Sequence, residues 1–203
     1  MTSVAGTAIL SLVISLDAIR AGLAAHPPRL RDGPRRAAVA VVLCERGPHA
    51  EMLFIERARR FGDPWSGHMA FPGGRVDPGD RDERDAAERE AREEVGLDLR
   101  DAEPFGRLDD LHAGVPLVAP LVLSAFVYRT DRPMPLVPNQ EVRTALWVPI
   151  PALVEPARHV PYRWGPLSYP GVLVGEPDRH VVWGLTYQLL EGLFDRIGVP
   201  FKR

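Results

Sequence analysis

The sequence predicts an α/β fold, and three features of the chain support that class. Apolar runs typical of strands recur along the chain, for example at 37–43, 52–55 and 117–128. Residues 87–95 and 180–197 instead carry apolar side chains at helical spacing. Of the 203 residues, 45% are hydrophobic, which is enough for one sizeable core, so we expect a single domain.

The first 14 residues are interpreted as an N-terminal extension of a single domain that spans residues 15–203. The run 8–15 is apolar, but no Lys or Arg precedes Arg20, so the basic segment of a signal peptide is missing. The run is also shorter than the roughly 20 residues that a membrane helix needs. We therefore expect a cytoplasmic protein without a membrane partner. The extension is either poorly ordered or an apolar strip that covers a second subunit in a homodimer.

The first part of the chain predicts one helix and three strands. The helix runs from Ser15 to Ala25, because Ser15 is a favoured N-cap and Pro27 cannot continue a helix. Its buried face would carry Leu16, Ile19 and Leu23. The strands are expected at 37–43, which is fully buried, at 52–55 and at 68–71, with a turn at 47–49.

The remainder predicts further strands and a closing helix. The strand at 117–128 is long and rich in Val and Leu, so we expect it to be central. The other strands are expected at 105–111, 142–148 and 169–174, with a helical turn at 151–154. The closing helix, 180–197, would turn inward the side chains of Val181, Leu185, Leu189 and Phe194.

Between these halves lies a short acidic helix. Ala87, Ala91 and Val95 form a narrow apolar stripe, and Gly96 is a natural helix stop. Glutamates at positions 90, 93 and 94 are spaced i, i+3 and i+4, so their carboxylates leave one face and repel one another. A divalent cation would convert that repulsion into ligation, because hard cations prefer carboxylate oxygens. The alternative is a solvated acidic face that is neutralised by Arg89 and Arg92.

This helix and the turn expected at Gly73-Gly74 before it resemble the Nudix box, G-x5-E-x7-R-E-U-x-E-E-x-G-U, where U is a bulky apolar residue. There are three departures: Asp80 replaces the first Glu, eight residues rather than seven separate it from Arg89, and Ala91 is small for U. The first two departures resemble the coenzyme A pyrophosphatase branch of the Nudix superfamily. The positions that match the motif are Gly74, Arg89, Glu90, Glu93, Glu94, Gly96 and Leu97.

The resemblance implies an α/β/α sandwich with a mixed sheet between helices, and hydrolysis of a nucleoside diphosphate linked to another group. It implies that Mg²⁺ or Mn²⁺ is bound by Glu90 and Glu94, with Glu93 sharing an ion or orienting the water. Gly73 would contribute its carbonyl, because only glycine lets the backbone approach so closely. Arg89 is interpreted as a structural partner that holds the glutamates.

A fourth carboxylate is recruited from a distant loop in many members, and Glu141 lies in a similar Asn-x-x-Glu-Val segment. It is either a further catalytic carboxylate or one half of a salt bridge between loop and sheet. His68 is interpreted as a packed histidine, because Mg²⁺ prefers oxygen ligands.

Residues 67–74 resemble the G-x-x-x-F-P-G-G ending of a second motif in coenzyme A-type members, and residues 182–186 resemble their last helix. The basic residues that those members carry just upstream are replaced here by residues 63–66, Asp-Pro-Trp-Ser. Nearby arginines are therefore assigned to the substrate, together with Gly74. These arginines are Arg57, Arg59 and Arg60.

The substrate that this resemblance implies is coenzyme A or an acyl derivative. ADP-ribose, NADH and nucleotide sugars are alternative substrates, and a non-catalytic Nudix-fold binding module is an alternative function. The intact three-glutamate face argues against the binding module, which has no need to concentrate negative charge. A net charge of −2 gives no electrostatic reason to expect nucleic acid as a partner. Cys44, the only cysteine, lies in an apolar run and is interpreted as a buried bystander.

Overall fold

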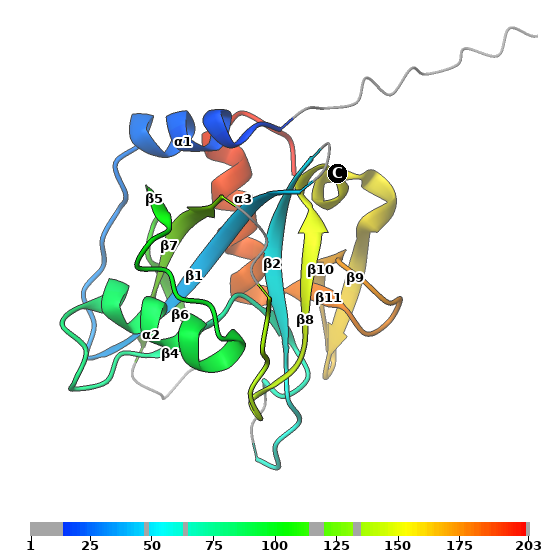
Figure 1. Ribbon diagram of the computed structural model, residues 1–203. Coiled ribbons are helices and arrows are strands. Elements are labelled where there is room, and N and C mark those ends of the chain that lie inside the picture. Colours follow the sequence, from blue (N-terminus) through cyan, green and yellow to red (C-terminus); the bar gives the residue numbers. More distant parts are fainter. Residues whose placement is uncertain (1–13, 47–48, 63–64, 114–119, 132–134, 202–203) are drawn as a thin grey trace, which may run out of the picture.

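The computed structural model describes residues 14–46, 49–62, 65–113, 120–131 and 135–201. Within them, an eight-stranded sheet and a three-stranded sheet pack with three α-helices (Figure 1). In chain order the elements are α1 (Leu16–Ala25), β1 (Arg35–Arg46), β2 (His49–Arg57), β3 (Met69–Ala70), β4 (Gly73–Arg75), α2 (Glu83–Val95), β5 (Glu103–Arg107), β6 (Leu111–Ala113), β7 (Leu121–Thr130), β8 (Val142–Pro149), η1 (Ile150–Val154), η2 (Pro156–Arg158), β9 (His159–Trp164), β10 (Leu167–Leu173), β11 (Val181–Trp183) and α3 (Gly184–Arg196).

The large sheet is mixed, as predicted. Its main strand order is β3-β2-β1-β7-β5, with β1 and β7 parallel and the other pairs antiparallel. Strand β7 has β1 on one side and β5 and β6 on the other, which confirms that the long Val- and Leu-rich strand is central. Strand β4 pairs with β1, and β8 pairs with β2. The sheet therefore brings β4 beside the strand that lies in its middle.

Strand β1 contributes to a hydrophobic core on each face of the sheet. Ala38, Ala40 and Val42 pack in one core with the apolar residues of α2. Val41 and Leu43 face the opposite way and pack with residues of α1 and α3. Because successive side chains of a strand point to opposite faces, one buried strand serves both cores. Figure 1 shows the sheet between α2 on one side and α3 on the other, so the predicted α/β/α sandwich is confirmed.

Local capping explains where α1 and α2 begin and end. The Ser15 hydroxyl accepts the Ala18 N–H at 3.1 Å, which confirms Ser15 as the predicted N-cap of α1. The Asp82 carboxylate caps α2 by accepting the Asp85 N–H at 2.8 Å. Gly96 ends α2 in the left-handed region, with φ of 71°, as a C-terminal glycine commonly does.

The strand expected at 105–111 is instead two short strands, β5 and β6. Asp110 lies between them, is completely buried, and accepts hydrogen bonds from the Arg107 guanidinium at 2.6 Å and the Arg31 N–H at 2.9 Å. A buried carboxylate needs such hydrogen-bond partners. The strand is interrupted at Asp110, where the chain provides them. The following strand begins at Leu121, and residues 117–119 of the longer predicted strand lie outside the described residues.

The closing helix is also shorter than predicted. Val181–Trp183 is not helical but forms β11, which pairs antiparallel with Gly171–Leu173 of β10. Gly184 has φ of 63°, a conformation that separates the strand from the helix after it. Within α3, Leu189 and Phe194 are buried and Leu185 is partly buried, as the apolar spacing predicted.

Other predictions fall partly outside the described residues. Residues 1–13 of the predicted extension and residues 47–48 of the predicted turn are not described, and His49 is the first residue of β2. Ile14, the last residue of the predicted extension, packs in the core. Cys44 is buried, as predicted, and its thiol lies 3.5 Å from the Glu45 carbonyl oxygen. Among the described residues, no helix combines the length and apolar character needed to cross a bilayer.

Candidate active site

The two glycines expected to form a turn are extended in β4, between β1 and α2. A Cβ added at Gly73 would lie 2.3 Å from the Ala38 carbonyl oxygen, and one added at Gly74 would lie 2.3 Å from Oε1 of Glu90. Gly73 also has φ of 156°, which residues with side chains rarely adopt. The prediction of a turn was therefore wrong. The close packing against Ala38 and Glu90 explains why glycine is needed at both positions, and the contact of the Gly73 carbonyl with a metal ion stays a prediction.

Glu94 is the most deeply buried carboxylate of α2, with 2% of its surface exposed. Its Oε2 accepts a hydrogen bond from the Gly73 N–H at 2.8 Å, so β4 and α2 meet at this side chain. Burial raises the pKa of the Glu94 carboxyl to about 7, and the negative charges of Glu90 and Glu141 act in the same direction. The Gly73 hydrogen bond and the positive charge of Arg57 only partly oppose this rise.

Glu90 and Glu93 leave the same helix but differ in exposure. The side chain of Glu90 is 16% exposed and lies against Gly74, whereas that of Glu93 is 52% exposed. Burial raises the pKa of the Glu90 carboxyl, and the charges of Glu93 and Glu141 add to the rise, against the lowering effect of Arg89. The three glutamates predicted as ligands thus form a gradient from buried to exposed.

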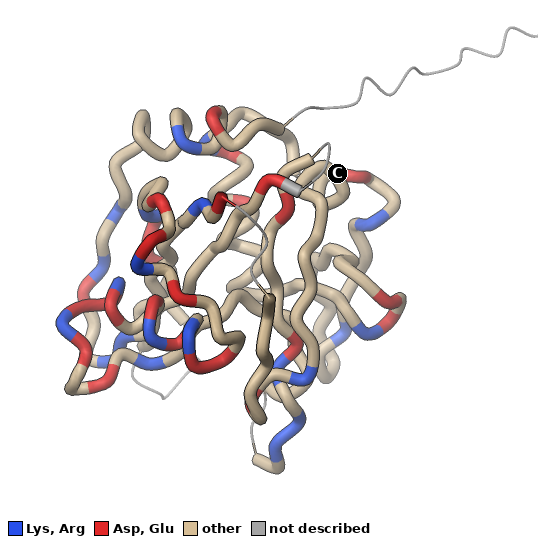
Figure 2. The backbone as a smooth tube through the Cα atoms, viewed as in Figure 1, with Lys and Arg blue, Asp and Glu red and all other residues tan. Residues whose placement is uncertain are grey.

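Arg89 links the glutamates of α2 to the turn that precedes the helix. Its Nε and Nη2 donate to the two carboxylate oxygens of Asp80 at 2.9 and 3.1 Å, and Nη2 also donates to the Arg75 carbonyl at 3.1 Å. Its Nη1 donates to Glu90 at 3.0 Å and to Glu93 at 3.1 Å. Charges of both signs alternate along α2 and this turn in Figure 2. These contacts support the interpretation of Arg89 as the structural partner of the glutamates, and they give Asp80 a role as its anchor.

Glu141 is brought toward α2 by the backbone of the loop before β8. The Asn139 N–H donates to the Glu94 carbonyl at 2.9 Å, and the Glu141 N–H donates to the Asn139 side chain at 2.7 Å. The Glu141 carboxylate accepts a hydrogen bond from Nη2 of Arg60 at 2.9 Å. Glu141 therefore forms a salt bridge, but with Arg60 in the connection after β2 and not with a residue of the sheet. Its role as a further catalytic carboxylate stays a prediction.

The three arginines assigned to the substrate lie in different surroundings. Arg57, at the end of β2, exchanges backbone hydrogen bonds with Gly67 and His68, each at 3.0 Å, and its charge acts on Glu94. The Arg59 side chain runs past Gly67, whose added Cβ would lie 3.4 Å from the Arg59 Nε. Arg60 is bound to Glu141. Residues 63–64, the Asp-Pro that replaces basic residues in the resemblance, lie outside the described residues.

The donor set suits Mg²⁺ or Mn²⁺ in chemistry but is not gathered around one point. Among the described residues, no three His, Cys, Asp or Glu side chains are arranged to hold a metal ion. Glu90 and Glu93 are turned to Arg89, and Glu141 is turned to Arg60. All four carboxylates supply hard oxygen ligands. The carboxylate of buried Glu94 accepts a hydrogen bond from the Gly73 backbone, and the charge of Arg57 acts on it. The residues therefore fit such an ion if Glu90 exchanges its arginine contact for the metal.

Sequence reasoning missed a second buried glutamate, Glu56 of β2. It is 1% exposed, and its carboxylate oxygens accept hydrogen bonds from Arg179 at 2.7 Å and from Arg143 at 3.4 Å. The His180 Nε2 lies 3.4 Å from the same carboxylate. A charged residue directly after the apolar run 52–55, inside a strand, was the signal that would have pointed to it.

Comparisons with known proteins identify the family of the chain. A family model described as NUDIX domain matches residues 34–167. A human protein named mitochondrial coenzyme A diphosphatase NUDT8 is 34% identical over 176 residues, which is 83% of this chain and 72% of the human protein. A Photorhabdus laumondii protein named uncharacterized Nudix hydrolase NudL is 30% identical over 181 residues, 85% of this chain and 90% of that protein.

Two further comparisons concern length and fold. An uncharacterized Schizosaccharomyces pombe protein is 34% identical over 148 residues, but the match spans 44% of its length. A crystal structure of a MutT/nudix family protein from Enterococcus faecalis superposes with a TM-score of 0.55 over 91% of this chain and 70% of that chain. Its sequence identity is 17%, so this similarity supports the fold alone.

Proposed function

Because the chain belongs to the NUDIX domain family of hydrolases that act on pyrophosphate bonds, we propose that its substrate is coenzyme A or an acyl-coenzyme A. Water cleaves the diphosphate, and the products are adenosine 3′,5′-bisphosphate and 4′-phosphopantetheine or its acyl derivative. The observation that supports coenzyme A as the substrate is the match, over 83% of the chain, to a human protein named mitochondrial coenzyme A diphosphatase NUDT8.

The acidic face of α2 supports hydrolysis that depends on Mg²⁺ or Mn²⁺. Glu90 and Glu94 would hold the ion, and Glu93 and the Gly73 carbonyl would complete its protein ligands. When bound, the ion would neutralise the charge of the diphosphate and lower the pKa of the attacking water. Glu141, whose charge already acts on Glu90 and Glu94, is the further carboxylate that would orient that water.

The arginines at the end of β2 support recognition of an additional phosphate. Leu53 and Ile55 of β2 pack in the core on the α2 face. The charge of Arg57, at the end of the same strand, acts on Glu94 of α2. Arg59 follows two residues later and lies along Gly67. Charge-assisted hydrogen bonds to phosphate are about twice as strong as neutral ones, so either guanidinium would select a substrate that carries a 3′-phosphate.

The test compares coenzyme A with its 3′-dephospho form and with ADP-ribose, using purified protein with Mg²⁺ or Mn²⁺. We expect the highest kcat/KM for coenzyme A and a loss of most of that preference in Arg59→Gln. Arg163→Gln is the matched control, because Arg163 is exposed and its neighbours Tyr162 and Trp164 point to the opposite face of β9.

Two outcomes would contradict the assignment. If the 3′-phosphate contributes nothing to kcat/KM and ADP-ribose is cleaved faster than either coenzyme, the substrate is a different nucleoside diphosphate derivative. If Arg163→Gln changes the preference as much as Arg59→Gln does, the arginines act through overall charge and not through a phosphate contact.

A further inference from the structure

Three of the four tryptophans gather in one aromatic cluster. Trp65 stacks on Trp164 with ring centroids 5.6 Å apart and planes 16° apart. Trp183 stacks on Tyr162 at 4.7 Å and 19°, and lies 6.3 Å from Trp65. His68 contacts Trp183 edge to face at 4.9 Å. The cluster therefore joins the connection before β3 to strands β9 and β11 of the three-stranded sheet.

The cluster reaches the surface and is not only a core. Trp65 is 46% exposed, and Tyr162 and Trp164 are each half-buried. Tyr162 and Trp164 are two residues apart on β9, so both rings lie on the face that Trp65 covers. Large aromatic surface left accessible on a folded protein commonly marks a place where a ligand or partner binds.

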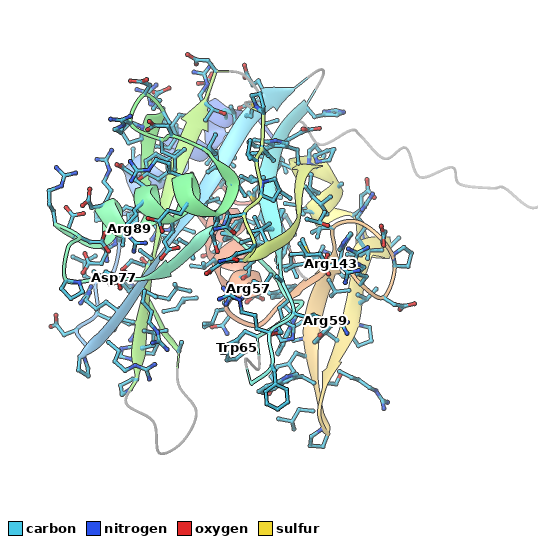
Figure 3. All side chains as sticks on the ribbon, turned by 60° about the horizontal axis from the view of Figure 1, so that its bottom comes forward. Arg57, Arg59, Trp65, Asp77, Arg89 and Arg143 are labelled. Atoms are coloured by element: carbon cyan, nitrogen blue, oxygen red, sulfur yellow. The ribbon has the colours of Figure 1, made fainter. Side chains whose placement is uncertain are left out.

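The cluster is also connected to the acidic face. The carbonyl of His68, one of its members, accepts the Arg57 N–H at 3.0 Å. Five residues after His68 comes Gly73, whose N–H binds Glu94. Burial raises the pKa of the Tyr162 hydroxyl, while the charge of Arg59 opposes the rise, so this guanidinium lies within electrostatic reach of the cluster. Figure 3 shows Arg57, Arg59 and Trp65 on one side of the molecule.

We propose that the Trp65–Trp164 stack is the binding surface for the purine base of the nucleotide substrate. This inference rests on the proposed function and adds to it the part of the site that recognises the base. A base presents a flat π-face that stacks on aromatic rings, and the neighbouring arginines suit the phosphates attached to its ribose. The pantetheine arm of coenzyme A is a flexible amide chain without a flat face, so this surface favours the adenosine end.

The binding test uses tryptophan fluorescence, because the cluster contains its own probes. Trp147 lies in β8 and packs in the core on the α2 face, so Trp147→Phe leaves only the cluster tryptophans to report. We expect adenosine 3′,5′-bisphosphate to quench this emission with saturation. Inorganic pyrophosphate, which has the charge but no base, and 4′-phosphopantetheine should leave it unchanged. Saturable quenching by 4′-phosphopantetheine but not by the bisphosphate would overturn the proposal.

Variants in the wild-type background test the stack directly, with affinity for adenosine 3′,5′-bisphosphate measured by calorimetry. We expect Trp164→Ala to raise the Kd by roughly tenfold and Trp164→Phe to restore most of the affinity, since a ring is kept. Phe61→Ala is the control, because Phe61 is a fully exposed aromatic residue in the same connection as Trp65. An equal loss in Phe61→Ala, or unchanged affinity in a folded Trp164→Ala, would overturn the proposal.

The outcome is separable from that of the proposed function. Coenzyme A hydrolysis without base-dependent quenching rejects the stacking surface and leaves the substrate assignment intact. Base-dependent quenching in a protein that does not cleave coenzyme A retains the surface and rejects the assignment.

Discussion

Two buried glutamates, one toward each face of the large sheet, are treated in opposite ways by the rest of the chain. Glu94 of α2 is 2% exposed and Glu56 of β2 is 1% exposed. Burial pushes the pKa of both carboxyls upward. For Glu56 the hydrogen bonds and charges of Arg179, with those of Arg143, outweigh burial and lower the pKa. For Glu94 a backbone N–H is the main opposing contact, and the pKa stays raised at about 7.

The difference distinguishes a carboxylate whose charge is neutralised by arginines from one whose pKa remains raised. Burying a carboxylate costs several kcal/mol unless a partner compensates, and the protein supplies that partner to Glu56 from three side chains. Glu94 instead lies among further carboxylates. An unfavourable arrangement of this kind is typical of functional sites.

Removal of divalent cations is expected to abolish turnover completely. Arg89 pairs with Glu90 and Glu93, but the contact of Glu94 is a backbone N–H, and the charges of Glu90 and Glu141 act on it. The diphosphate of the substrate would therefore meet an excess of negative charge. Hydrolysis is measured after dialysis against EDTA, and activity should return with Mg²⁺ or Mn²⁺. Full turnover in excess EDTA would show that the glutamates act without a metal ion.

Glu94→Gln is expected to lower kcat by more than roughly 100-fold, because a direct metal ligand should matter more than the outer contacts that orient one. The effect should fall on kcat more than on KM if the ion acts chiefly in the transition state. The melting temperature without metal should not fall, since an amide avoids the cost of a buried charge.

Glu88→Gln is the matched control, because Glu88 lies on the same helix but bonds to Arg84 and Tyr128. Its turnover should equal that of the wild type. A wild-type kcat in Glu94→Gln would remove Glu94 from the site.

Glu56→Gln is expected to destabilise the fold by about 2 kcal/mol and to leave the metal requirement unchanged. Removing one partner of a buried ion pair is strongly destabilising, but Arg179 and Arg143 are partly exposed and keep access to water, which reduces the loss. The free energy of unfolding is measured in urea, with Glu45→Gln as an exposed control on β1. Equal stability of the two variants would show that the Glu56 contacts contribute nothing.

Acid should weaken the fold through Glu56 by a smaller amount. Its folded pKa lies below its unfolded value of roughly 4.3, so its contribution is complete above that pH and is lost as the pH falls through the folded pKa. The difference in unfolding free energy between wild type and Glu56→Gln should therefore shrink when urea titrations at pH 7 are repeated at pH 3.5. A constant difference at both values would contradict the linkage.

Features that depend on neighbours in the sequence were predictable. The Ser15 cap, the apolar stripe of α2 and the Gly96 stop depend on residues within one or two turns, and all three are confirmed. The resemblance placed Gly73 and Glu94 in one motif, and the structure adds that the Gly73 N–H donates to the Glu94 carboxylate.

Features that depend on remote partners were not predictable. The apolar residues of Val181–Trp183 are compatible with a helix or a strand, and pairing with Gly171–Leu173 stabilises the strand. The extended Gly73–Arg75 likewise follows from pairing with β1. A salt bridge was one of the two roles considered for Glu141, but its partner Arg60 lies 81 positions away and leaves no periodic signal in the sequence.

The separation of these contacts along the chain has a consequence for how the protein emerges during synthesis. Glu94 is only 21 positions from Gly73, whereas the Arg179 that neutralises Glu56 is 123 positions beyond it. Synthesis proceeds from the N-terminal side, so Gly73 and Glu94 are both present well before Arg179. Of the two arginines that pair with Glu56, Arg143 emerges first and Arg179 follows later. A chain that stalls between these two arginines would carry its acidic motif but only part of the positive charge that neutralises Glu56.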